Sequence, residues 1–449
     1  MKKILAVLLT SFVLSSCGDD FLDKNPTIGL SSDKLNDLAS MQALIYGAYS
    51  DIRPFVHQPA LYGAAMMRDV LNRNRGEYDA FYDHQISTNM TSWMYTAGYT
   101  TLSSLNFVAV SDLDAMEGTD AERNSILGDM HFLRALVYFE LNNYFSLPST
   151  GYSVPLVLEP LQIESRVETA TSMEVMSQIE IDIESARIRF ENVSGEANYL
   201  AATALAARIY FYHEKYDLAY ERANEVIESG AFNVDPSVEL SFVPQGNSSE
   251  NIFSIKFSVS DGSGTSPSAR IWEAYQFSSI NGFFSLNPNG TIATLVSDEN
   301  DARYTAFYTE EGSLVYVNGK YATDLMDYRY IRLPEMYLTR AESNVMSQQS
   351  VSQQDVDDIN ILRNRANPSS MLSSVPTIEE ALNLIFEDRS RELAFELGDR
   401  FINTKRLKKG IIRIGQEGAG FKPYAEYADL LVFPFPEIEV AVHGLTRDR

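Results

Sequence analysis

The chain has 449 residues, of which 45% are hydrophobic and 22% are charged, so it can bury a large core and fits one or two domains. Its formal net charge at pH 7 is −25. Nucleic-acid binding needs clustered Lys and Arg that displace counterions from phosphates, so this charge argues against a nucleic-acid partner. The same charge disfavours polyanionic ligands and weakly favours neutral or cationic ones.

The first residues have the pattern of an export signal. Lys2 and Lys3 precede the apolar run Ile4–Leu14, which is too short to span a bilayer. The run is followed by Cys17, the only cysteine of the chain, which has no partner for an internal disulfide. This segment resembles the lipobox of bacterial lipoproteins. The resemblance implies a signal peptide over residues 1–16 and lipidation of Cys17, with acyl chains that anchor the protein to a membrane.

Two acidic residues, Asp19 and Asp20, follow this cysteine closely. Their position resembles the surface-export signal of Bacteroidetes-type lipoproteins, which implies an outward-facing location on the outer membrane. The alternative is a solvated tether that carries no targeting information.

Helical periodicity dominates the next two hundred or so residues. Apolar residues recur at intervals of three and four, which predicts helices over residues 33–53, 101–113, 128–145 and 172–190. Pro54 is expected to end the first of these helices, because the residue before a proline disfavours the helical conformation.

The segment over residues 200–232 predicts two helices joined by a short turn. Ala207 and Ala219 are small enough to let the two helix axes approach closely, and Tyr210 and Tyr216 fill the groove beside them. Hairpins of this kind are typical of tetratricopeptide (TPR) repeats. The sequence therefore predicts an all-α-dominated fold with a TPR-like helical-hairpin scaffold.

The pattern changes between residues 237 and 328. Short β-like runs alternate there with clusters of Gly, Ser, Asn and Pro, which predicts a loop-rich region with short strands. Helices are predicted again over residues 333–346, 353–365 and 377–397. Pro434 and Pro436 then predict an extended backbone near the C-terminal end of the chain, because proline fixes the φ angle.

Several charged residues lie among apolar ones on the predicted helices, namely Arg134, Arg340, Glu342, Arg391 and Glu392. A buried guanidinium must be paired, so we interpret these residues as inter-helix ion pairs. A catalytic role for Glu342 or Glu392 is the less favoured alternative, because structural ion pairs also perturb carboxylates.

No pattern in the sequence predicts an active site, a metal site or a cofactor site. The five histidines are scattered without metal-ligand spacing, and neither a Gly-rich phosphate loop nor a nucleophile elbow occurs. A glycosidase needs two suitably spaced carboxylates, and such a pair can be neither located nor excluded among 61 Asp and Glu residues. We therefore predict a protein that is not an enzyme and holds no metal or cofactor.

Several short motifs follow one another along the chain: those that begin at Phe132 (FLRALVYF), the alanine-rich hairpin, and those that begin at Asp301 (DAR), Ile331 (IRLPEMYLTRAE), Asn360 (NILRNRA) and Ile385 (IFEDRSRELAFE). Their order resembles the SusD/RagB family of Bacteroidetes outer-membrane nutrient-binding lipoproteins. The resemblance covers nearly the whole chain after Cys17 and implies a single SusD-like domain over residues 17–449. Asn403, Thr404 and Leu407 depart from the Asp-Leu and Trp usual in the family near the last helix.

The resemblance also implies a ligand platform built from two regions on one face. In the first, Asp69 and Arg75 precede Asn89, Trp93 and Tyr95. The second region contains Trp272 and Tyr275. Aromatic rings stack on the apolar faces of sugars, while amide, carboxylate and guanidinium groups bind the hydroxyls. For Trp93 the alternative of a core residue at the start of a helix stays open.

The function that follows from the resemblance is capture of an oligosaccharide at the cell surface and its delivery to a SusC-like TonB-dependent outer-membrane transporter. One alternative is a binder of peptides or other non-glycan nutrients on the same scaffold. A further alternative is a TPR-type protein-assembly scaffold, which the loop-rich region and the export signal favour less.

Overall fold

The structure is a computed structural model that describes residues 35–445 except 57, 73–77, 163–164, 194–195, 245–247, 257–266, 276–283, 324–325, 410, 413–420 and 427. The predicted signal peptide, Cys17 and the acidic residues after it lie outside the described residues. No helix in the described part of the chain combines the length and the apolar character needed to cross a membrane.

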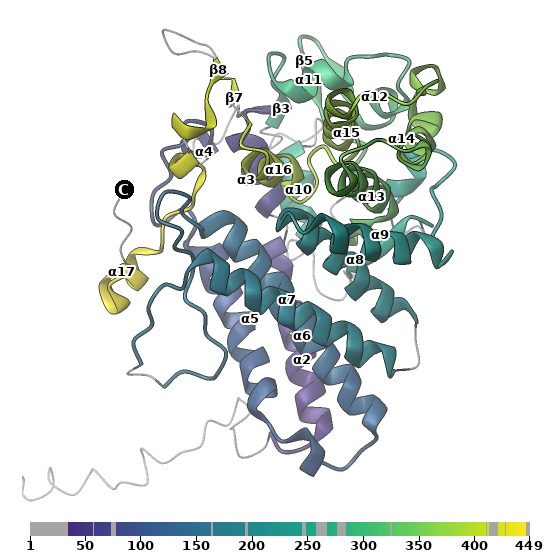
Figure 1. Cartoon of the computed structure of the whole chain (residues 1–449). Helices are drawn as coiled ribbons and strands as arrows, with labels where there is room; N and C mark the ends of the chain where they lie inside the picture. Colours follow the sequence, from purple (N-terminus) through teal and green to yellow (C-terminus); the bar gives the residue numbers. More distant parts are fainter. Residues whose placement is uncertain are drawn as a thin grey trace, which may run out of the picture.

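Long helices form one end of the molecule, where α2, α5, α6 and α7 lie side by side (Figure 1). Their bounds are α2 Leu38–Val56, α5 Ser92–Val110, α6 Asp120–Phe145 and α7 Ser172–Glu191. Both α6 and α7 begin with a capping box, in which Thr119 or Thr171 exchanges hydrogen bonds with a glutamate three residues later. The C-terminal half of α6 is buried on nearly all sides, because it lies at the centre of this bundle.

Pro54 does not end the first helix, contrary to the expectation from the sequence. Helix α2 continues through Pro54 to Val56. A proline removes one backbone hydrogen bond, but here it lies in the last turn, and the side chains of Phe55 and Val56 are fully buried. Packing of the last turn therefore outweighs the lost hydrogen bond.

The predicted helical hairpin is confirmed as α8 (Glu196–Tyr212) and α9 (Tyr216–Glu228). The side chains of Ala207 and Ala219 are fully buried, so the helices approach closely where these small residues lie. Helix α8 packs on α7 and on α9, and α9 packs on α13 (Leu333–Gln348). The hairpin thus connects the N-terminal bundle with the C-terminal helices.

The C-terminal helices are α13, α14 (Gln353–Ala366), α15 (Ile378–Glu392) and α16 (Asp399–Arg406). The helix predicted over residues 377–397 ends early, at Glu392. Phe395 and Leu397 adopt positive φ angles of 64° and 55°, a left-handed conformation that cannot continue a right-handed helix. We call residues 393–398 the left-handed turn.

Short elements fill the remainder of the described chain. The helices are α3 (Gln58–Met66), α4 (Asp79–Tyr82), α10 (Pro267–Tyr275), α11 (Thr291–Val296), α12 (Ala302–Phe307) and α17 (Glu437–His443). Antiparallel pairs of strands are β1 (Val70–Asn72) with β3 (Phe284–Leu286), β2 (Asn251–Ile255) with β6 (Tyr328–Arg332), β4 (Thr309–Glu311) with β5 (Leu314–Tyr316), and β7 (Ile411–Ile412) with β8 (Phe421–Lys422). The predicted all-α-dominated fold with a loop-rich region and short strands is confirmed.

The pairing of β1 with β3 decides where the candidate site lies. Val70 pairs with Leu286, so the segment after α3 and the segment after α10 share one small sheet. Helix α10 also packs on α3 and on β3. The two regions predicted to carry the ligand platform are therefore adjacent, although about 200 residues separate them in the sequence.

Candidate functional site

The charged motif residues are ion-paired. Arg134 on α6 donates two hydrogen bonds to Asp182 on α7, from Nε at 2.9 Å and from Nη2 at 2.7 Å. Arg340 binds Asp358 in the same bidentate manner. Glu342 accepts from Arg406. These contacts join different helices, so the interpretation as inter-helix ion pairs fits these residues. It is wrong for Arg391, because the carboxylates that pair with this residue, Glu387 and Asp388, lie on its own helix α15.

Glu392 lies inside a larger buried group of charges between α15, β6 and the loop-rich region. Its carboxylate pairs with Arg332, Arg303 and Arg365. Burial alone would raise the pKa of this carboxyl, but the surrounding cations hold it well below its usual range. A carboxylate that stays ionised and is bonded on several sides is a structural anion rather than a general acid.

We call the whole group the buried charge cluster. Among the described residues it contains four carboxylates and four cations, joined by ion pairs: Glu250, Asp301, Glu392 and Glu396, with Arg303, Lys320, Arg332 and Arg365. The equal number of charges of each sign allows burial without a net charge. The cluster joins the loop-rich region to the C-terminal helices.

Asp69, predicted as a ligand-binding residue, lies in a structural position. Its side chain is 4% exposed and pairs with Arg400 of α16 at 3.0 Å. Burial raises the pKa of Asp69 to about 6, although Arg400 opposes this shift. Its backbone carbonyl accepts a hydrogen bond from the amide of Asn287, next to β3. Asp69 therefore holds the two site regions and α16 together, and offers almost no surface to a ligand.

An aromatic cluster connects the two predicted regions. Trp93 lies 6.0 Å from Tyr62 between ring centroids, and Tyr62 lies 5.9 Å from Tyr78. Tyr78 packs edge-on against Phe284 at 4.9 Å, and Phe284 lies 5.6 Å from Tyr275. Trp93 on α5 and Tyr275 on α10 therefore belong to one continuous set of ring contacts.

The predicted aromatic residues differ in their exposure. Tyr95 and Tyr275 are buried, so neither presents a ring face for stacking in this structure. Both pack against other rings, Tyr95 against Phe145 at 5.5 Å and Tyr275 against Tyr321 at 5.9 Å. A core position for these two rings corrects the expectation that they contact ligand directly.

Trp93 and Trp272 are each partly exposed, on the first turn of α5 and on α10. The indole N–H of Trp93 donates to the hydroxyl of Tyr62 at 3.0 Å, which fixes the orientation of the ring. Asn89 is exposed and lies two residues before Thr91, the N-cap residue of α5. Arg75 lies outside the described residues.

Sequence reasoning did not assign a role to Tyr62, Phe81 or Phe433. Tyr62 stacks on Phe81 with centroids 4.0 Å apart, and both rings contact Phe433 near the C-terminal end. The density of aromatic residues between 78 and 82 could have indicated an aromatic cluster in this part of the chain. Nothing local in the sequence indicates that Phe433, more than 300 residues later, completes the same cluster.

Two family models match the sequence. Residues 20–211 match a SusD-like family described as "Starch-binding associating with outer membrane". Residues 289–427 match the model described as "SusD family". The chain belongs to the SusD/RagB family.

Solved structures of SusD-like proteins share the fold. The chain matches a SusD superfamily protein from Bacteroides thetaiotaomicron with a TM-score of 0.79 and 21% identity, over 92% of this chain and 100% of that one. A SusD superfamily protein from Bacteroides vulgatus matches with a TM-score of 0.76 and 20% identity, over 92% and 98%. A SusD-like carbohydrate binding protein from Bacteroides vulgatus matches with a TM-score of 0.75 and 15% identity, over 91% of this chain and 97% of that one. No curated protein sequence matches the chain significantly.

Proposed function

We propose that this SusD-like protein binds an oligosaccharide at the cell surface and passes it to a SusC-like TonB-dependent transporter. The observation that carries the proposal is the junction between the two site regions. The β1–β3 pairing and the aromatic cluster hold α5 and α10 in one part of the molecule, and each of these helices carries a partly exposed tryptophan.

The chemistry of these side chains suits a sugar. The N–H of Trp93 is already used by Tyr62, so what this ring offers a ligand is apolar ring surface, which matches the C–H face of a pyranose. The exposed amide of Asn89 has a donor and an acceptor for hydroxyl groups. Because Trp93 is held by a hydrogen bond and by ring contacts, stacking on it costs little side-chain entropy.

The proposal includes a single domain after the signal peptide, a lipid anchor at Cys17 and no chemistry on the ligand. Support for the outer membrane comes from the description of the matched family, and support for a carbohydrate comes from the similar protein of Bacteroides vulgatus. The use of Glu342 and Glu392 in buried ion pairs weighs against a catalytic role for either of them. A non-glycan nutrient is the alternative ligand.

The test uses a soluble form that starts after Cys17. Intrinsic fluorescence is followed during titration with neutral, acidic and amino-sugar oligosaccharides and with mixed peptides, for the wild type, Trp93→Ala and Trp272→Ala. Tyr46→Ala is the matched control, because Tyr46 is 68% exposed on α2 and belongs to neither site region. We expect saturable binding of one glycan class that either tryptophan variant weakens at least tenfold and the control does not.

Other outcomes would redirect the assignment. A signal with peptides alone would favour the non-glycan alternative. Glycan binding that survives both tryptophan substitutions would move the site away from α5 and α10. The partner is tested separately, by co-purification with the transporter from outer membranes with and without Cys17→Ala.

A further inference from the structure

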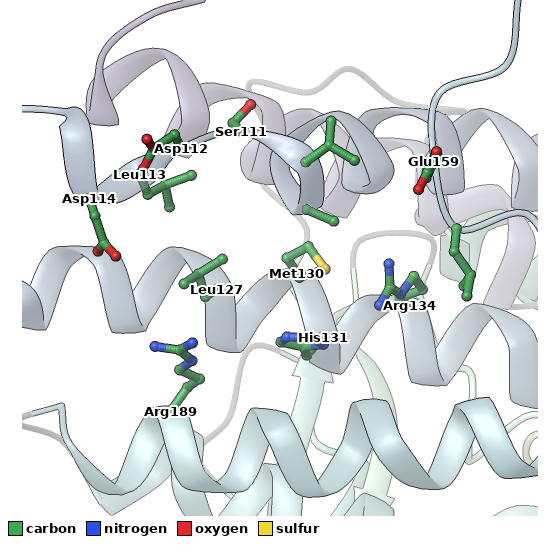
Figure 2. A pocket seen from close by; sticks show the side chains of 13 residues that line it. Ser111, Asp112, Leu113, Asp114, Leu127, Met130, His131, Arg134, Glu159 and Arg189 are labelled. Carbon is green, nitrogen blue, oxygen red and sulfur yellow. The ribbon is translucent and has the colours of Figure 1, made fainter.

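A groove of about 470 Å³ lies on the helical bundle (Figure 2). It is lined by the last turn of α5, whereas Trp93 of the aromatic cluster lies in the first turn of that helix. Its walls are the C-terminal end of α5 with the turn that follows, the middle of α6, and the connection between α6 and α7 near Glu159. The side chains of Leu127 and Met130 form an apolar floor on α6. Apolar residues from the end of α5 and from the connection extend it.

Carboxylates lie at both ends of this floor. Figure 2 shows Asp112 and Asp114 at one end and Glu159 at the other. All three are exposed. Asp112 caps the short turn after α5 by accepting from the amide of Ala115. No cation of the described residues pairs with any of the three carboxylates.

The walls of the groove are fixed by hydrogen bonds. On the side of Glu159, the hydroxyl of Tyr138 binds both the amide and the carbonyl of Val157 at 2.7 Å, and the amide group of Asn106 donates to the same carbonyl at 2.8 Å. On the opposite side, Arg123 donates to the carbonyl of Leu113 at 2.9 Å. The carboxylates therefore stand on backbone segments that are held in place without a ligand.

The charges leave the groove negative. Arg134 lines the groove, but the fully buried Asp182 neutralises it. Arg189 contributes one positive charge and donates to the side chain of Asn124. Against it stand the three exposed carboxylates, so these four groups together have a net charge of −2. The C-terminal end of α5 adds the negative end of a helix dipole.

We propose that this groove binds an α,ω-diamine or a longer polyamine. Such a ligand has a positive charge at each end of an apolar spacer, and the groove has carboxylates at each end of an apolar floor. A sugar fits less well, because no Phe, Tyr or Trp side chain is among the described residues that line the groove. The site is separate from the proposed oligosaccharide platform, so the two can be tested independently.

The experiment is calorimetric titration of the soluble protein at low ionic strength with α,ω-diamines of four to eight carbons, spermidine and monoamines of equal length. The variants are Asp112→Asn, which keeps the capping oxygen, and Glu159→Gln. The matched control is one double variant, Glu168→Gln together with Glu379→Gln. It removes two exposed carboxylates that do not line the groove. We expect one diamine length to bind best, about fivefold tighter than its monoamine, and each groove variant to remove about that factor.

Three results would overturn the proposal. Equal loss of binding in the control variant would mean non-specific attraction to an acidic protein. Equal affinity for a diamine and its monoamine would mean that only one end of the groove is used. Binding of lysine-containing peptides without binding of any diamine or spermidine would mean that the groove recognises a polypeptide. Retention of glycan binding by Asp112→Asn and Glu159→Gln would separate this site from the platform.

Discussion

Lys320 offers a sharp test of how the loop-rich region is held. Its side chain is fully buried, and its ammonium donates to the carboxylate of Glu396 at 2.6 Å. It also donates to the backbone carbonyls of Glu392 at 2.8 Å and Ala394 at 3.0 Å. Burial lowers the pKa of Lys320, and Glu396 opposes that shift. One side chain from the loop-rich region thus binds three oxygens at the start of the left-handed turn.

Substitution of Lys320 by Met keeps most of the volume and removes the charge. The carbonyl of Ala394 then loses its side-chain donor, and the buried charge cluster changes from four cations to three against four carboxylates. Glu396 keeps two hydrogen bonds from Arg332, both 2.9 Å, so the loss is smaller than for an anion left without any partner. We expect a decrease in the free energy of unfolding of about 3–5 kcal/mol, the range for breaking a buried pair.

Urea unfolding at pH 7, followed by circular dichroism, measures this decrease. Lys256→Met is the matched control, because the ammonium of Lys256 also lies 2.8 Å from a carboxylate, that of Asp327, but its side chain is 74% exposed. We expect less than about 1 kcal/mol for this control, as for other surface pairs. If both variants lost the same free energy, the argument that burial decides the effect would be refuted.

Three further predictions use the same assay. Gly398→Ala should destabilise by more than about 2 kcal/mol, because φ is +68° and a Cβ would lie 2.2 Å from the Tyr144 hydroxyl; no loss would refute the steric reasoning. Burial raises the pKa of Glu140 to about 7, so the folded state holds a proton that the unfolded state releases above about pH 4.5. Stability should fall as pH rises from about 5 to 7, and Glu140→Gln should flatten that slope; an unchanged slope would contradict this. Arg134→Lys should cost about 2–4 kcal/mol, because an ammonium cannot reproduce the bidentate contact with Asp182; a neutral result would refute it.

The sequence predicted the features that depend on local periodicity. The hairpin over residues 200–232 could be recognised because small and aromatic residues recur at helical spacing within one short segment. The paired state of Arg134 and Arg340 could also be inferred, since a guanidinium among apolar residues needs a carboxylate. The partner itself could not be named, because Asp182 and Asp358 belong to other helices.

The sequence was less informative where contacts between distant segments decide the structure. The left-handed turn lies in a stretch with good helical periodicity, and the hydroxyl of Tyr321 binds the carbonyl of Phe395 at 2.8 Å. Asp69 looked like a ligand residue in a polar loop, and only its pairing with Arg400, 331 residues later, makes it structural. Tyr95 and Tyr275 were buried by rings from other elements. Composition reveals aromatic residues, but not which face of each ring is covered.

The segment over residues 433–436, which belongs to neither a helix nor a strand, has a consequence for the order in which the chain folds. The amide of Phe433 donates to the carbonyl of Tyr144 at 2.8 Å, and the hydroxyl of Thr91 donates to the carbonyl of Pro434 across 343 residues. The rings of Phe433 and Phe435 also cover Phe145. The N-terminal bundle therefore cannot complete its core until nearly the whole chain is present. Contacts of such long sequence separation slow folding, and the incomplete chain exposes apolar surface in the meantime.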